Sequence, residues 1–163
     1  MIGTRPEVIK MVPVIRALKA STWAKCVVVV TAQHRKLLDQ MLQRFNVTVD
    51  YDLDLMQANQ GLNQLIARML PALEEIIQKE QPYAVLAQGD TATVFGAALA
   101  AFHANISFGH IEAGLRTYNL EQPFPEEGYR QMVSRITRWN FAPTKSASQA
   151  LQQEGISPEQ IYV

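Results

Sequence analysis

The sequence of 163 residues has one cysteine, no excess of charge and no long apolar run. Cys26 alone can form neither an internal disulfide nor a thiolate zinc site, and a reduced, cytoplasmic setting is the simplest interpretation. Fifteen Lys and Arg balance fifteen Asp and Glu, so the net charge of +0 gives no attraction to a nucleic acid. No apolar run approaches the ~18 residues of a membrane span. No apolar stretch precedes the first charged residues, which argues against a secretory signal.

Two kinds of ligand motif are absent as well. Neither GxxxxGK[ST] nor GxGxxG occurs, which excludes a Walker loop and removes the fingerprint of a nicotinamide cofactor. A His-x-Glu pair is present at His110 and Glu112, but no third or fourth metal ligand stands at a recognisable spacing from it. We therefore expect neither a cofactor nor a metal ion.

What the sequence does contain is an alternation of short β-branched runs and helical patterns, with a 48% hydrophobic content that can form a core. The predicted strands are Cys26–Thr31, Tyr83–Ala87, Ile106–His110, Asn140–Ala142 and Ile161–Val163. The predicted helices are Pro6–Ala20 with a kink or break at Pro13, His34–Phe45, Leu62–Glu80 with an interruption near Pro71, Thr91–Ala104, Glu126–Arg138 and Lys145–Glu154. This alternation predicts an α/β fold with a parallel sheet covered by helices on both faces.

Both ends differ from those of a self-contained domain. Only Met1 and Ile2 precede the first helix, so the first strand is largely missing, and the sequence stops inside an apolar run. We expect residues 1–163 to form one domain of a longer protein. Errors of several residues in the predicted element boundaries would account for the same observations.

Polar loops follow the three clearest strands, and the carboxyl ends of parallel strands meet at one edge of a sheet. This edge is expected to carry two acids, two guanidinium groups and an imidazole: Asp90, Glu112, Arg35, Arg116 and His34. Asp90 directly precedes a helix, and from its spacing alone a capping role is favoured. Glu112 is a poor helix cap. If the strand continues, its side chain lies on the same face as that of His110. The pair is then a catalytic pair, part of a metal site, or a structural pair in which His110 only forms a hydrogen bond.

Two helix beginnings also carry charge. Arg5 and Lys10 stand at the start of the first helix, where free N–H groups and a guanidinium can bind phosphate, although a solvated helix start is the alternative. Glu126 and Glu127 begin a later helix, where acids interact favourably with the helix dipole. Alternatively, residues 118–125 form a flap that carries an acid into a cleft.

The segments GTRPEVIKMVPV, TAQHRKLLDQML, DLDLM, QGDTATVFGAALAAF, GHIEAGLRT, PFPEE and FAPT follow one another in this order. In this combination the sequence closely resembles the N-terminal half of the non-hydrolysing UDP-N-acetylglucosamine 2-epimerases, from Gly3 to Val163. The resemblance implies a glycosyltransferase-B type fold, in which two Rossmann-like domains face each other across a cleft. Residues 1–163 would be the N-terminal domain, and the absent second domain would supply most uridine and diphosphate contacts and a catalytic histidine.

The family interconverts UDP-GlcNAc and UDP-ManNAc, for cell-surface polysaccharide synthesis, by removal of the C2 proton with elimination and re-addition of UDP. By this resemblance the catalytic carboxylates are Asp90, Glu112 and Glu126, and the substrate-binding cations are Arg5 and Lys10. Gln33 and His34 match positions at which bacterial members bind a second, activating substrate molecule. The sequence departs from the common family pattern at Ala92, Tyr129 and Asn140.

The partners implied are a UDP-sugar substrate, the missing C-terminal domain and a second copy in a homodimer of the intact protein. No cofactor is implied, because the proton leaves and returns as a proton. We expect the 163-residue chain to be inactive by itself. The alternatives are a nonenzymatic remnant or half-subunit that pairs with a separate second half, a hydrolysing relative that releases free N-acetylmannosamine, and a sugar transferase of the same fold.

Overall fold

The computed structural model describes residues 1–31, 35–57 and 59–163. Gln33 and His34 lie outside the described residues. The strands are β1 (Val29–Val30), β2 (Tyr51–Asp52), β3 (Ala84–Gln88), β4 (Ser107–Ile111), β5 (Trp139–Phe141) and β6 (Ile161–Tyr162). The helices are α1 (Arg5–Ala20), α2 (Arg35–Arg44), α3 (Leu62–Glu80), α4 (Ala92–His103), α5 (Glu126–Arg135), α6 (Lys145–Gln153) and the short 3-10 helix η1 (Pro158–Gln160). None of the described helices combines the length and apolar character needed to cross a membrane.

All strand pairs are parallel. β3, β4, β5 and β6 form a four-stranded sheet in that order, and β1 pairs with β2. Ile2 forms a parallel bridge with Val30, and the amino group of Met1 donates to the carbonyl oxygen of Leu86 at 2.7 Å. The first two residues therefore lie between β1 and β3 and connect the two sheets.

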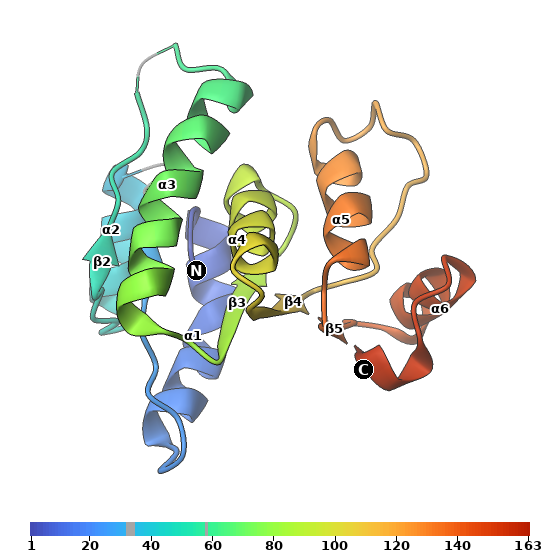
Figure 1. The fold of residues 1–163 in the computed structure, drawn as a ribbon, viewed down its shortest axis with the longest axis horizontal. Helices are drawn as coiled ribbons and strands as arrows, with labels where there is room; N and C mark the ends of the chain where they lie inside the picture. Colours follow the sequence, from blue (N-terminus) through green and yellow to red (C-terminus); the bar gives the residue numbers. More distant parts are fainter. Residues whose placement is uncertain (32–34, 58) are drawn as a thin grey trace.

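Helices cover both faces of the strands. Successive residues of β3 alternate between the faces, because Val85 packs against the core cluster of α3 and α4, whereas Leu86 packs against that of α1 and α2. Figure 1 shows α3, α4 and α5 side by side on one face. The predicted Rossmann-like α/β fold is confirmed.

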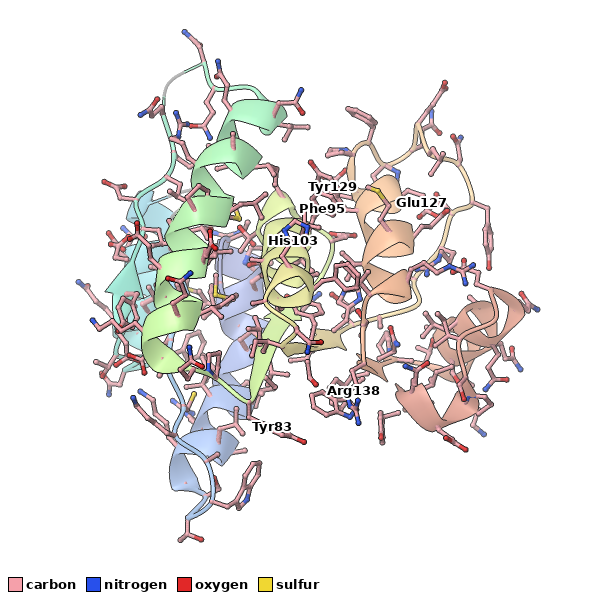
Figure 2. All side chains as sticks on the ribbon, viewed as in Figure 1. Tyr83, Phe95, His103, Glu127, Tyr129 and Arg138 are labelled. Carbon is pink, nitrogen blue, oxygen red and sulfur yellow. The ribbon has the colours of Figure 1, made fainter. Side chains whose placement is uncertain are left out.

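α5 is attached to α4 by a pair of aromatic rings. Tyr129 stacks on Phe95 with a centroid separation of 4.8 Å (Figure 2). Tyr129, one of the departures from the family pattern, is therefore a packing residue, and it fixes the orientation of the helix that carries Glu126, Glu127 and Arg130.

α1 continues through Pro13 and α3 continues through Pro71, so a break at Pro13 and the interruption near Pro71 are both wrong. Both prolines are exposed, so the apolar stripe on the opposite face of each helix stays continuous. In α3 that stripe buries Leu65, Met69 and Leu73. Packing of such a stripe stabilises a helix more than one lost backbone hydrogen bond destabilises it.

The first predicted strand is shorter in the structure than in the prediction, and its neighbour β2 was not predicted. Only Val29–Val30 of Cys26–Thr31 is strand. The N–H of Val28 donates to the carboxylate of Asp50 at 2.7 Å, so a side chain ends the ladder there.

Gly3 allows the loop before α1 to contact α4. A Cβ atom at Gly3 would lie 2.1 Å from Oγ1 of Thr93 and 2.9 Å from Oγ1 of Thr31. These hydroxyls form a buried hydrogen bond of 2.8 Å. We expect Gly3→Ala to lower the free energy of unfolding by about 1–3 kcal/mol, because the core is already filled there.

Urea unfolding of Gly3→Ala measures this effect, with Gly128→Ala as the matched control. Gly128 lies inside α5, and nothing lies within 4 Å of its added Cβ, so alanine there should stabilise by about 0.5–1 kcal/mol. Equal effects of the two substitutions would contradict the steric argument.

Candidate active site

The loop before α1 is tied to the loop after β3 by a buried acid. The carboxylate of Glu7 is 3% exposed and accepts from the N–H of Gly3 at 2.5 Å and from the hydroxyl of Thr91 at 2.8 Å. Burial raises the pKa of Glu7, and these hydrogen bonds oppose the rise. Thr4 is the N-cap residue of α1 and forms a capping box with Glu7. Glu7 therefore ties the start of α1, where Arg5 is exposed at the first position, to the loop that follows β3.

Glu112 is held from two other segments. Nζ of Lys10 on α1 lies 2.6 Å and 2.7 Å from its two carboxylate oxygens, and the side-chain amide of Gln88 at the end of β3 donates to one of them. Glu112 has φ 68°, a left-handed conformation that is strained for a residue with a side chain. Such strain is concentrated at functional sites, where the surrounding structure holds it.

His110 holds the turn before Asp90 by a hydrogen bond to Gly89. It is fully buried in β4, and its Nε2 lies 2.6 Å from the carbonyl oxygen of Gly89. Burial lowers the pKa of His110 to about 4, so the neutral ring donates this hydrogen bond. Of the three interpretations of His110 and Glu112, the structural one therefore describes His110. It fixes the Gly89–Asp90 turn.

Asp90 does not cap α4, because the N-cap residue is Thr91. The capping interpretation favoured from spacing is therefore wrong. Instead, Oδ2 of Asp90 lies 3.0 Å from Nη2 of Arg130 on α5. Burial raises the pKa of Asp90, Arg130 opposes the rise, and the negative charges of Glu126 and Glu112 add to it. Three acids from distant parts of the sequence are thus close enough to influence one another.

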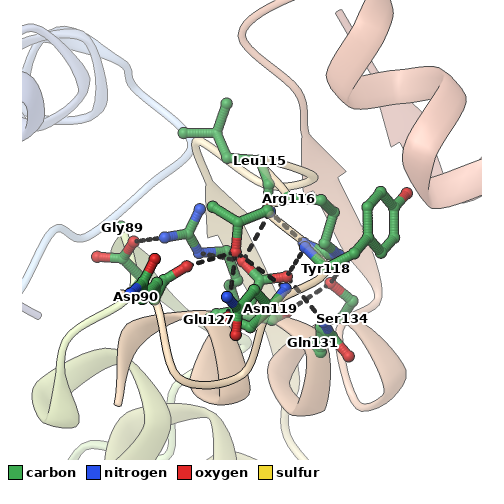
Figure 3. A network of polar contacts seen from close by, with 12 residues as sticks. Gly89, Asp90, Leu115, Arg116, Tyr118, Asn119, Glu127, Gln131 and Ser134 are labelled. Atoms are coloured by element: carbon green, nitrogen blue, oxygen red, sulfur yellow. Dashed lines mark hydrogen bonds and ion pairs between the residues drawn. The ribbon is translucent and has the colours of Figure 1, made fainter. Parts of the chain in front are cut away.

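Arg116 does not belong to this edge. Its side chain is 1% exposed, and its Nε lies 2.7 Å from the carboxylate of Glu154 beyond the end of α6. It also donates to the hydroxyl of Ser134 at 2.8 Å (Figure 3). Arg116 thus joins the Glu112–Thr117 loop to α5 and α6, and it is unavailable to a ligand at the edge, contrary to the prediction.

Sequence reasoning missed Gln88, Arg130 and the burial of Glu127. Glu127 is fully buried, and its carboxylate accepts hydrogen bonds from the loop before α5 rather than serving only the helix dipole. The spacing of Glu127 and Arg130 by three residues was the available signal for an ion pair on one helix face.

An open pocket of about 360 Å³ adjoins Glu112. Lys10, Gln88 and Glu112 form its polar side, and Phe141 and Tyr162 contribute aromatic side chains. Within residues 1–31, 35–57 and 59–163, no group of three His, Cys, Asp or Glu side chains is arranged to hold a metal ion. The arrangement offers carboxylates for proton transfer and cations beside a helix N-terminus.

The sequence matches the profile of one protein family, described as UDP-N-acetylglucosamine 2-epimerase, over residues 16–163. A UDP-N-acetylglucosamine 2-epimerase of Neisseria meningitidis is 45% identical over 161 residues, which are 99% of this chain and 43% of that protein. One of Salmonella typhimurium shows the same identity and coverage. The chain thus spans less than half the length of these relatives.

Solved structures give the same result. The N. meningitidis UDP-GlcNAc 2-epimerase bound to UDP-GlcNAc superposes with a TM-score of 0.95 at 45% identity, over 99% of this chain and 44% of that one. The Methanocaldococcus jannaschii enzyme in complex with UDP-GlcNAc and UDP superposes with a TM-score of 0.93 at 34% identity, over 99% and 44% of the two chains.

Proposed function

Since the chain belongs to the UDP-N-acetylglucosamine 2-epimerase family, we propose that the intact protein interconverts UDP-GlcNAc and UDP-ManNAc. The observation that carries the proposal is the proximity of Glu112 and Glu126 to Asp90, together with the ion pair between Lys10 and Glu112. Arg5 stands at the start of the helix that carries Lys10. Inversion at C2 needs groups that remove and return a proton, and expulsion of UDP needs cations near the diphosphate.

The acids differ in their surroundings, which suits a division of roles. Asp90, with its pKa raised by burial, suits a group that takes up and releases a proton during turnover. Glu112 presents a carboxylate fixed by Lys10 and Gln88. Arg5, at the N-terminus of α1, suits phosphate binding, because the helix dipole and the guanidinium act on the same anion.

We extend the proposal to the rest of the protein. Residues 1–163 would form the N-terminal Rossmann-like domain, and a second domain, as long as the unmatched part of the relatives, would close the other side of the substrate cleft. The intact protein would act in the cytoplasm, as a homodimer and without a cofactor. Gln33 and His34 would contact a second substrate molecule.

A chimera tests the function directly. Residues of this chain replace the matching 161-residue segment of the N. meningitidis enzyme, which keeps the remainder of its own sequence. With UDP-GlcNAc in D₂O we expect UDP-ManNAc that carries deuterium at C2, detected by NMR. Release of free N-acetylmannosamine would instead favour the hydrolysing alternative, and absence of any turnover would contradict the proposal.

The chain alone is a second test. Stabilising a departing diphosphate requires groups placed on both sides of it, so we expect no turnover by residues 1–163. Epimerisation by the purified 163-residue chain would contradict the need for a second domain.

A further inference from the structure

One buried ion network connects Asp90 to the loop that follows Glu112. The guanidinium of Arg130 is about one-tenth exposed and lies between two carboxylates. Its Nη2 is 3.0 Å from Oδ2 of Asp90, and its Nε is 3.5 Å from Oε2 of Glu127. Figure 3 shows Asp90 and Glu127 within a single network of polar contacts.

Glu127 also holds the loop itself. Its two oxygens accept from the backbone N–H groups of Thr117 and Tyr118, each at 3.0 Å, and from the side-chain amide of Gln131 at 2.7 Å. Tyr118 has φ 58°, so its backbone adopts a conformation that needs such support. Burial alone would raise the pKa of Glu127, but the hydrogen bonds and the charge of Arg130 outweigh it, and the pKa is lowered.

We propose that Glu127 is a positioning residue, which holds Arg130 against Asp90 and fixes the Thr117–Tyr118 loop to α5 beside the reacting groups. The role rests on the proposed function, because Asp90 is the group that it serves. Glu127 is inaccessible to solvent, so we place it behind the groups that would face the substrate. It acts through Arg130, because the guanidinium of Arg130 lies between the carboxylates of Glu127 and Asp90.

The position of Arg130 between two carboxylates sets the direction in which Glu127 changes the pKa of Asp90. The charged groups that act on Asp90 are Arg130 and Glu126 from α5 and Glu112 after β4. The hydroxyl of the neighbouring Thr91 donates to Glu7 of α1, and the buried ring of His110 is neutral. An uncompensated guanidinium would favour the ionised form of Asp90 strongly. Burial raises the pKa of Asp90 above its ordinary value, and Arg130 opposes that rise. Glu127, whose carboxylate lies 3.5 Å from Nε of Arg130, offsets part of the charge that Arg130 presents to Asp90.

The test is an NMR titration of the Asp90 carboxyl carbon in the 163-residue chain. Glu127→Gln should lower the pKa of Asp90 by about 0.5–1, because Arg130 then acts on Asp90 alone. Arg130→Met should raise it. A merely structural role would loosen the site in both variants and let water reach Asp90, so the pKa would fall in both. Glu121→Gln, on the exposed part of the same loop, should leave it unchanged.

The double variant decides whether Glu127 acts through Arg130. In the Arg130→Met background, Glu127→Gln should change the pKa of Asp90 much less than in the wild type. Amide exchange at Thr117 or Tyr118 should rise at least about tenfold in Glu127→Gln, while core amides keep their protection. An unchanged pKa of Asp90 in Glu127→Gln, or equal shifts in both backgrounds, would overturn the proposal.

If Glu127→Gln does not fold, Arg130→Met still tests the proposal. A lowered pKa of Asp90 in Arg130→Met would contradict it. In the active chimera, the acid limb of the pH profile of kcat/KM should move down in Glu127→Gln and up in Arg130→Met. An inactive wild-type chimera would contradict the proposed function, whereas the titrations would still report on Glu127.

Discussion

Replacing Glu112 by glutamine in the chimera is expected to lower kcat for epimerisation of UDP-GlcNAc by about 10²–10⁴-fold, with a much smaller change in KM. The amide has nearly the volume of the carboxylate and can still accept a hydrogen bond from Lys10. It can neither take up a proton nor present the negative charge that faces Asp90. Steady-state rates of UDP-ManNAc formation measure the effect.

Glu121→Gln supplies the matched control, because Glu121 is exposed in the loop that follows Glu112. It should retain the wild-type kcat. Urea unfolding of both variants separates lost chemistry from lost stability. A wild-type kcat in Glu112→Gln would remove Glu112 from the mechanism, even if the fold and the other acids are as described.

The proximity of two of the candidate acids could be predicted from the sequence, because a parallel sheet gathers the loops after its strands at one edge. Asp90 and Glu112 follow β3 and β4, which pair in register, so their proximity is a consequence of topology. The third acid, Glu126, was identified by resemblance. Its proximity depends on how α5 packs against α4, which the stacking of Tyr129 on Phe95 determines.

The hydrogen-bond and ion-pair partners of these acids could not be predicted, because residues at irregular distances along the sequence supply them. Glu127 accepts from backbone N–H groups of a loop without regular structure, and no pattern of side chains announces such bonds. Arg116 was expected beside Glu112, but its partner Glu154 is 38 residues away and on another element. The side chain of Arg116 is buried against Glu154 instead of lying exposed beside Glu112. Which side chains are buried depends on the packing of the whole fold, so a local sequence pattern does not reveal it.

The buried histidine gives the second large expected effect, which is a loss of stability in mild acid. The pKa of His110 is lowered to about 4 in the folded chain, whereas an unfolded chain has a histidine pKa near its ordinary value of 6.5. As the pH falls below 6.5, His110 binds a proton in the unfolded state but stays neutral in the folded state. The free energy of unfolding should therefore fall by about 2 kcal/mol between pH 7 and pH 5 from His110 alone.

Glu7 and Asp90 act in the opposite direction, since a carboxyl group with a raised pKa binds its proton more readily in the folded state. Comparison of variants therefore isolates His110. His110→Gln keeps an amide donor for the carbonyl oxygen of Gly89 but does not titrate, so its unfolding free energy should depend less steeply on pH than that of the wild type. His103→Gln, at the exposed end of α4, should retain the wild-type slope. Parallel curves for wild type and His110→Gln, from urea unfolding at pH 5, 6 and 7, would show that His110 is not held neutral by the fold.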